Sequence, residues 1–178
     1  MSPAVQRRPV LGLALAGTLA LLSGRTRAAA LPRPTGPVVL TVSGPTVTRA
    51  NTPAGADFDM AMLSSLAQST ISTRTPWYEG ARRFTGPLLR DVLASAGAQS
   101  IGGRTLRATA LNDYRIEIPA DDALRHDVIV ARRLDDRPLP VREKGPLFVI
   151  YPFDDKPELA NPTFFGRCIW QLRSIEIR

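Results

Sequence analysis

Prolines recur along this sequence and restrict its fold more than any other feature. The chain holds 16 prolines in 178 residues, about twice the ~5% that is usual in proteins. Proline has no backbone N–H, so it breaks the helices and central strands in which it falls. The sequence therefore predicts short elements joined by many turns and excludes a helical bundle.

The first 30 residues form a separate segment. Arg7 and Arg8 precede an apolar run at residues 10–22, and three alanines follow at 28–30. A positive start, a short apolar run and small residues are typical of a secretory signal peptide, and the run is shorter than the ~20 residues that cross a bilayer. We therefore expect residues 1–30 to be a signal peptide cleaved near Ala30 and the mature chain to be periplasmic. Both general export and twin-arginine export stay open.

Charge and cysteine content exclude several classes of protein. Four of the 23 basic residues lie in residues 1–30, which contain no acid, so 19 basic and 16 acidic residues remain, a net charge of +3. Nucleic-acid binding needs a concentrated basic stripe, and no such stripe occurs. Cys168 is the only cysteine and His126 the only histidine, which excludes an internal disulfide and a structural zinc site. No stretch after residue 30 is apolar enough to cross a membrane.

The pattern of the mature chain predicts an α+β fold with mixed β-sheets and a few short helices. We expect an extended lead-in at 31–37 and a single domain at 38–178. Strands are predicted at 38–42, 70–75, 105–111, 114–118, 127–134, 147–151 and 169–177, and helices at 57–66, 86–96 and 120–125. The helix at 57–66 would be capped by Asp57 or Asp59. Cys168 is expected inside the last strand, as part of the core.

Common catalytic arrangements are missing from the sequence. There is no Gly-x-Ser-x-Gly elbow and no glycine-rich phosphate loop. Polar and aromatic residues instead gather where predicted strands end, which is where binding sites often lie. Such clusters surround Trp77, Tyr114, Arg142, Tyr151 and Arg167.

Five segments together carry a family resemblance. They are Thr-Pro-Trp at 75–77, Phe-Thr-Gly-Pro-Leu-Leu-Arg-Asp-Val-Leu at 84–93, Leu-Asn-Asp-Tyr at 111–114, Val-Arg-x-Lys-Gly-Pro-Leu at 141–147 and Ile-Trp-Gln-Leu-x-x-Ile at 169–175. In their order and spacing, these segments resemble the small exported proteins of the molybdopterin-dependent oxidoreductase superfamily. The resemblance implies the sulfite-oxidase molybdopterin-binding fold over most of 38–178.

The resemblance also implies a ligand. Catalytic members carry a molybdenum-binding cysteine four residues before a tryptophan, and the matching residue here is Thr73, before Trp77. A threonine hydroxyl is a poor ligand for this metal. The resemblance therefore implies a pterin-binding protein more than a molybdopterin enzyme, and the expected ligands include reduced pterins. The residues expected around the pterin are Thr73, Thr75, Trp77, Asn112, Asp113, Tyr114, Arg142, Lys144, Tyr151 and Arg167.

Those residue types suit a pterin. Asp113 or Asn112 could accept from its guanidine-like edge, Arg142 or Arg167 could reach its carbonyl, and Trp77 or Tyr114 could stack on it. The resemblance further implies a membrane-bound partner, either a diguanylate cyclase/phosphodiesterase of cyclic-di-GMP turnover or a sensor kinase. Two alternatives stay open: a molybdopterin-dependent oxidoreductase with non-cysteine ligation, and an interaction module with an empty pocket.

Overall fold

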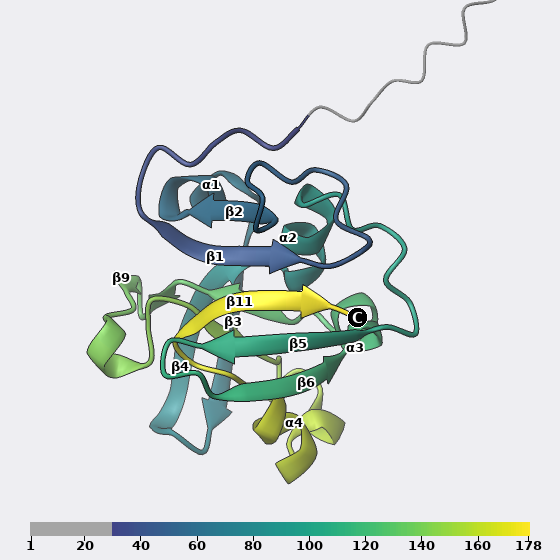
Figure 1. Cartoon of the computed structure of the whole chain (residues 1–178). Coiled ribbons are helices and arrows are strands. Elements are labelled where there is room, and N and C mark those ends of the chain that lie inside the picture. The colour runs from purple at the N-terminus through teal and green to yellow at the C-terminus, as the bar shows by residue number, and fades with distance from the viewer. Residues whose placement is uncertain (1–29) are drawn as a thin grey trace, which may run out of the picture.

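The computed structural model describes residues 30–178, which form short strands and short helices (Figure 1). About 21% of these described residues are helical and 40% are in strands or bridges, which confirms the predicted α+β class. The predicted signal peptide lies outside the described residues, apart from Ala30. Among residues 30–178, none of the helices has the length and apolarity to cross a bilayer.

The elements follow one another in mixed order. The strands are β1 (Val38–Ser43), β2 (Ala56–Asp59), β3 (Gln68–Thr75), β4 (Tyr78–Pro87), β5 (Thr105–Ala110), β6 (Arg115–Pro119), β7 (Ile129–Ala131), β8 (Arg133–Leu134), β9 (Arg137–Pro138), β10 (Phe148–Ile150) and β11 (Leu172–Ile177). The helices are α1 (Met60–Ser65), α2 (Leu89–Ser95), α3 (Ala120–Arg125) and α4 (Pro162–Arg167), with 3₁₀ turns η1 (Val141–Glu143) and η2 (Pro157–Leu159).

The larger sheet joins the two ends of the described chain. Its strand order is β2-β1-β11-β5-β6. β1 runs parallel to β11, with Thr41 opposite Ser174, and the other pairs are antiparallel. The last strand therefore lies in the middle of the sheet, between the first strand and the β5–β6 hairpin (Figure 1).

A second sheet and a strand pair pack against the first sheet. The four-stranded sheet has the order β3-β4-β8-β9, and β10 pairs with β7. Buried apolar side chains fill the space between these layers, among them Leu40, Phe84, Leu93 and Phe148. The β3–β4 hairpin turns at residues 76–77 and projects at one end of the molecule (Figure 1).

Near the contact between β4 and β7, two elements have limits that differ from those predicted from the sequence. The helix predicted at 86–96 begins only at Leu89, because Gly86 lies in β4. A Cβ at Gly86 would lie 2.0 Å from the carbonyl oxygen of Val130, so this glycine allows close approach of two backbones rather than starting a helix. The strand predicted at 127–134 is split into β7 and β8, which belong to different sheets.

The C-terminal region contains a helix, α4, where the sequence analysis predicted no regular element, and its last strand begins later than predicted. Asn161 caps α4, since its Oδ1 accepts from the N–H groups of Thr163 (3.0 Å) and Phe164 (3.4 Å). Pro162 follows at the first helical position, where its missing N–H costs nothing. The last strand begins at Leu172 rather than at residue 169, so Cys168 follows α4 and precedes β11.

Asp59 ties the extended lead-in to α1. Its Oδ1 accepts from the N–H of Met62 (2.8 Å), and its Oδ2 accepts from the N–H groups of Thr35 (2.8 Å) and Gly36 (2.9 Å). These bonds lower the pKa of Asp59 below its ordinary value, and the bond from the Met62 N–H has the largest effect. Asp59 is therefore the cap of α1. Asp57, the other candidate, lies in β2 and accepts from the Thr41 hydroxyl (2.6 Å).

We expect Asp59→Asn to reduce stability near neutral pH and to matter less in acid. Because the folded-state pKa is lowered, the stabilisation by the charged form is present above the unfolded-state pKa of about 3.9 and is lost as pH falls through the folded value. Asparagine keeps an oxygen for the cap but no charge. Urea midpoints at pH 7, 5 and 3 test this. A difference in urea midpoint between variant and wild type that is as large at pH 3 as at pH 7 would contradict the prediction.

Candidate functional site

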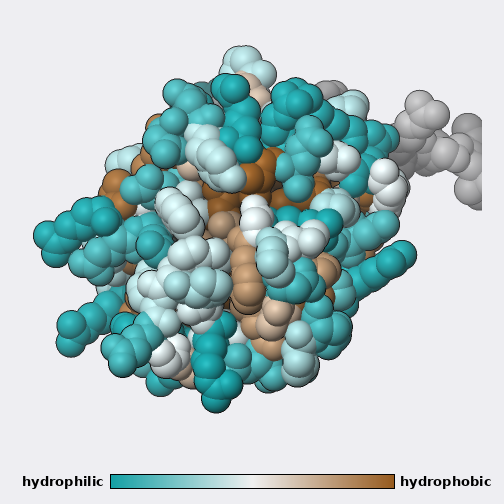
Figure 2. Space-filling view, turned by 90° about the horizontal axis from the view of Figure 1, so that it is seen from below, coloured by the Kyte–Doolittle hydropathy of each residue, from teal (hydrophilic) through white to brown (hydrophobic). Residues whose placement is uncertain are grey.

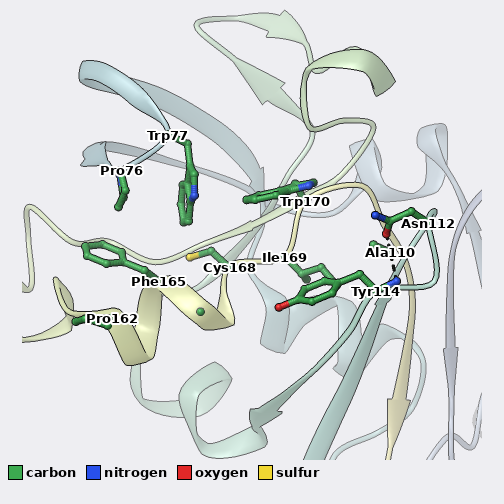
Figure 3. A pocket seen from close by; sticks show the side chains of 11 residues that line it. Pro76, Trp77, Ala110, Asn112, Tyr114, Pro162, Phe165, Cys168, Ile169 and Trp170 are labelled. Carbon is green, nitrogen blue, oxygen red and sulfur yellow. Dashed lines mark hydrogen bonds between the residues drawn. The ribbon is translucent and has the colours of Figure 1, made fainter.

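A cavity of about 560 Å³ lies where three segments meet. They are the tip of the β3–β4 hairpin, the β5–β6 turn, and α4 with the residues that follow it. The lining residues are Pro76, Trp77, Ala110, Asn112, Tyr114, Pro162, Phe165, Gly166, Cys168, Ile169 and Trp170 (Figure 3). The volume is within the range of about 300–1,000 Å³ for small-molecule sites. From below, the molecule shows apolar side chains in a central hollow ringed by hydrophilic ones (Figure 2).

Trp77 is the centre of an aromatic cluster on this cavity. Its ring meets those of Phe148, Phe165 and Trp170 edge-on, with centroids 5.4, 6.2 and 5.8 Å away. Phe148 is fully buried, and its ring centroid lies 6.1 Å from that of Trp170. Edge-to-face packing of this kind fixes ring orientation, so the cavity has preformed aromatic walls.

The polar groups on the cavity are few and uncharged. No Asp, Glu, Lys, Arg or His is among the lining residues. The side-chain oxygen of Asn112 accepts from the backbone N–H of Tyr114 (3.2 Å). The amide nitrogen of Asn112 therefore points away from the Tyr114 backbone. In Figure 3 the indole nitrogen of Trp77 and the hydroxyl of Tyr114 both face the space between these two residues. An uncharged, flat ring with a few polar edge atoms suits such walls.

Gln171 holds the rim of the cavity together. Its N–H donates to the carbonyl of Lys144 (2.9 Å), its carbonyl accepts from the N–H of Leu111 (2.9 Å), and its side chain donates to the carbonyl of Val141 (2.7 Å). The β5–β6 turn and the η1 loop are thereby attached beside Trp170. The Lys144 ammonium lies 4.8 Å from the Trp170 ring centroid, which is a cation–π distance.

A buried polar network attaches the end of α4 to α3. The carboxylate of Asp122 in α3 accepts from the Tyr151 hydroxyl (2.8 Å) and from the Arg167 guanidinium (2.8 Å). Burial, and then the Asp122 charge, raise the pKa of Tyr151 far above its ordinary value, so the hydroxyl stays a donor. The guanidinium also lies over the Phe164 ring, 4.8 Å from its centroid.

The structure brings three of the predicted site residues together at the cavity: Trp77, Asn112 and Tyr114. Asp113 is adjacent in sequence but is ion-paired with Arg173, and it is not on the cavity wall. The carboxylate expected to accept from a pterin is therefore engaged elsewhere.

The other predicted residues lie around the cavity or behind it. Thr73 is fully buried and exchanges hydrogen bonds with Asp154, accepting from its N–H (3.0 Å) and donating to its Oδ1 (3.2 Å). Thr75 is also buried. Arg142 is exposed and paired with Glu143 (3.5 Å).

Three further predicted residues stand outside the cavity lining. Lys144 covers Trp170 from the rim, and Tyr151 and Arg167 belong to the Asp122 network. Their contacts keep Trp170 and α4 in place, so these residues support the cavity walls.

Cys168 differs from its predicted surroundings. It is buried as expected, but it borders the cavity at the end of α4 instead of lying in the last strand. Burial raises the pKa of its thiol above the ordinary value, and the thiol is 3.5 Å from the carbonyl oxygen of Phe164. The thiol is therefore held in its neutral form.

Sequence reasoning missed Phe165, Cys168 and Trp170 as cavity residues. The alternation of apolar residues at 169–177 suggested a strand with Trp170 as one of its ordinary members. α4 ends at Arg167 and β11 begins only at Leu172, after Gln171 with its positive φ of 53°, so these three side chains lie outside the strand and line the cavity. The placement of Trp170 in a family segment was the signal that could have singled it out.

Comparison with known proteins identifies the domain. Residues 58–153, more than half of the chain, match the family model described as the oxidoreductase molybdopterin binding domain. No curated protein matches the chain. Among solved structures, the chain is similar to the sulfane dehydrogenase SoxCD from Paracoccus pantotrophus, with a TM-score of 0.56 and 16% identity over 78% of this chain.

The similar region is 37% of that SoxCD chain, so this protein corresponds to well under half of its relative's length. At this identity the likeness shows a shared fold, and it agrees with the mixed sheets described above. Together with the family match, it confirms the sulfite-oxidase-like molybdopterin-binding fold. The chain belongs to the family of the oxidoreductase molybdopterin binding domain.

Proposed function

We propose that this protein binds a pterin in the aromatic cavity and reports its presence to a membrane-bound partner. The observation that carries the proposal is the cavity itself, in which Trp77, Phe165 and Trp170 supply aromatic surface and Asn112 and Tyr114 supply polar groups. A pterin is a flat bicycle with hydrogen-bonding atoms around its edge. Stacking on an aromatic ring contributes about 0.5–1.5 kcal/mol beyond burial.

The cavity suits the pterin ring better than a molybdenum centre. Molybdenum in this family is held by a thiolate, and Thr73, at the matching position, is buried against Asp154 away from the cavity lining. Cys168 borders the cavity, but burial favours its neutral thiol. These residues do not fit the metal, so we assign no redox step to this chain.

We propose the periplasm as the site of action, because residues 1–30 have the pattern of a secretory signal. The partner would be a membrane-bound enzyme of cyclic-di-GMP turnover or a sensor kinase. Several large apolar side chains near the cavity are exposed, namely Leu111, Tyr114, Val141 and Trp170. A ligand seated among them would change the surface offered to the partner and so favour one bound state.

Mass analysis of the small molecule released from the folded, exported protein tests the proposal. Release of a metal-free pterin is the expected result. A molybdenum-bearing dithiolene pterin would instead support the alternative, a molybdopterin-dependent oxidoreductase with non-cysteine ligation. A protein that releases nothing and binds no added pterin would contradict both.

A further inference from the structure

We infer that the outer face of the four-stranded sheet docks on a bilayer surface rich in anionic phospholipids. The inference goes beyond the proposed function, because none of the residues that carry it lines the cavity. It starts from two arginine pairs, Arg82-Arg83 and Arg132-Arg133, that are far apart in the sequence. Pairing of β4 with β8 places Arg133 opposite Thr85, so the fold brings both pairs together on one sheet.

The strand register places arginines on the outer face of this sheet. Residues opposite each other in antiparallel strands share a face, as do residues two positions apart along one strand. Ser72 lies opposite Arg83, and Thr85 lies opposite Arg133. Ile71, which points to the other face, is buried, whereas Ser72 and Arg83 are exposed. The face that carries Arg83 and Arg133 is therefore the one in contact with solvent.

Three arginines on or beside this face have no ion-pair partner among residues 30–178. Arg133 donates to the backbone carbonyl oxygen of Asp136 (3.0 Å), and Arg132 donates to the amide oxygen of Gln68 (2.8 Å). Arg137, in β9, is the third. Burial, and then the charge of Arg133, lower the pKa of Arg132, so a nearby anion would stabilise these cations.

The other arginines of the sheet are ion-paired. The pairs are Arg83 with Asp136, Arg82 with Asp135 and Arg74 with Asp154. In the first pair both side chains are more than half exposed, at 55% and 61%, and exposed pairs are weak. The Arg83 guanidinium can therefore exchange its carboxylate for a phosphate, and the whole face carries an excess of positive charge.

The composition of the face favours lipid headgroups over a protein partner. Its paired outward positions hold arginine, serine and threonine, with Ala81 and Pro138 as apolar residues and no aromatic residue. Protein interfaces usually have an apolar core with aromatic anchors. Guanidinium groups instead bind phosphate oxygens through two parallel hydrogen bonds, and the hydroxyls of Thr70 and Ser72 can donate to further oxygens. An anionic leaflet presents such phosphates over its whole surface.

Cosedimentation of the exported protein with lipid vesicles tests the inference. Vesicles of equal parts phosphatidylglycerol and phosphatidylcholine should sediment the protein at about 50 mM salt and much less of it at about 300 mM, because salt screens the attraction. Vesicles of phosphatidylcholine alone should not sediment it. Equal sedimentation with both kinds of vesicle, or none with either, would overturn the inference. Binding to polyglutamate but not to vesicles would overturn it in favour of an acidic protein partner.

Matched variants locate the binding surface, with urea unfolding to check that each is folded. Arg133→Gln with Arg137→Gln should weaken partitioning onto the phosphatidylglycerol vesicles roughly 30-fold, since each arginine at an anionic surface contributes about 5-fold. Arg107→Gln with Arg115→Gln lowers the net charge equally, but on β5 and β6, and should have little effect. Ser72→Glu keeps every arginine, adds an anion at an exposed position of the face and should also weaken binding. Equal losses in the two double variants would mean that net charge alone drives binding and would overturn the inference.

Discussion

Replacing Trp77 with alanine is expected to weaken pterin binding roughly 10- to 100-fold, because stacking of a flat heterocycle on an aromatic side chain is worth about 1–3 kcal/mol. The same change should cost about 2–3 kcal/mol of unfolding free energy. The ring packs against Phe148, Phe165 and Trp170 but is only partly buried, so the cost should fall below that of a fully buried aromatic. Calorimetry with 7,8-dihydrobiopterin and urea unfolding measure the two effects.

Trp77→Phe is the matched control for this prediction. It restores a ring to the cluster, so stability and most of the affinity should return. Val38→Ala removes an apolar side chain that is 50% exposed and does not line the cavity, and it should not change the Kd. If Trp77→Ala bound 7,8-dihydrobiopterin as tightly as wild type, the cavity would not be the binding site.

Arg167→Met is expected to destabilise the fold by about 3 kcal/mol. It leaves the buried Asp122 carboxylate with the Tyr151 hydroxyl but without its cation, and removing one partner of a buried ion pair costs about 3–5 kcal/mol. We take the lower end because the Arg167 side chain is 23% exposed. Since Arg167 also covers Phe164, α4 should loosen and ligand affinity should fall. Urea unfolding at pH 7 is the measurement.

A double variant separates loss of the charge partner from loss of packing. Asp122→Asn combined with Arg167→Met removes both charges, while the amide oxygen can still accept from the buried Tyr151 hydroxyl, so that no buried charge is left unpaired. We expect the double variant to recover most of the stability lost in Arg167→Met. If Arg167→Met lowered the free energy of unfolding by less than about 1 kcal/mol, water would be screening this pair as it does a surface salt bridge.

Local patterns predicted many elements correctly. The β5–β6 hairpin and α3 lie where apolar alternation, the Asn112-Asp113 turn and Pro119 indicated, because these signals act over a few residues. Predictions failed where a segment's partner is remote in sequence. Gly86 suggested a helix start, but its lack of a side chain serves the contact with Val130.

The candidate site was predictable in part. Trp77, Asn112 and Tyr114 stand in turns next to strands, and turns are where binding residues collect. Trp170 and Cys168 could not be assigned in this way, since an apolar residue near the end of a chain is an ordinary core residue by its pattern alone. Their role depends on α4, which the helix cap at Asn161 places beside the hairpin tip.

The sequence by itself determined the α+β class, the short elements and the family, because proline content, apolar periodicity and ordered motifs are properties of the chain. Through the family resemblance it also led to the expectation, still a prediction, that Thr73 stands where catalytic members carry a cysteine. Only the tertiary structure decided which side chains face the cavity and which hydrogen bonds they have left to make. Asp113 and Asn112 are neighbours in sequence, yet one is neutralised by Arg173 and the other lines the cavity. Such a difference depends on contacts between strands that are distant along the chain, and no local pattern encodes it.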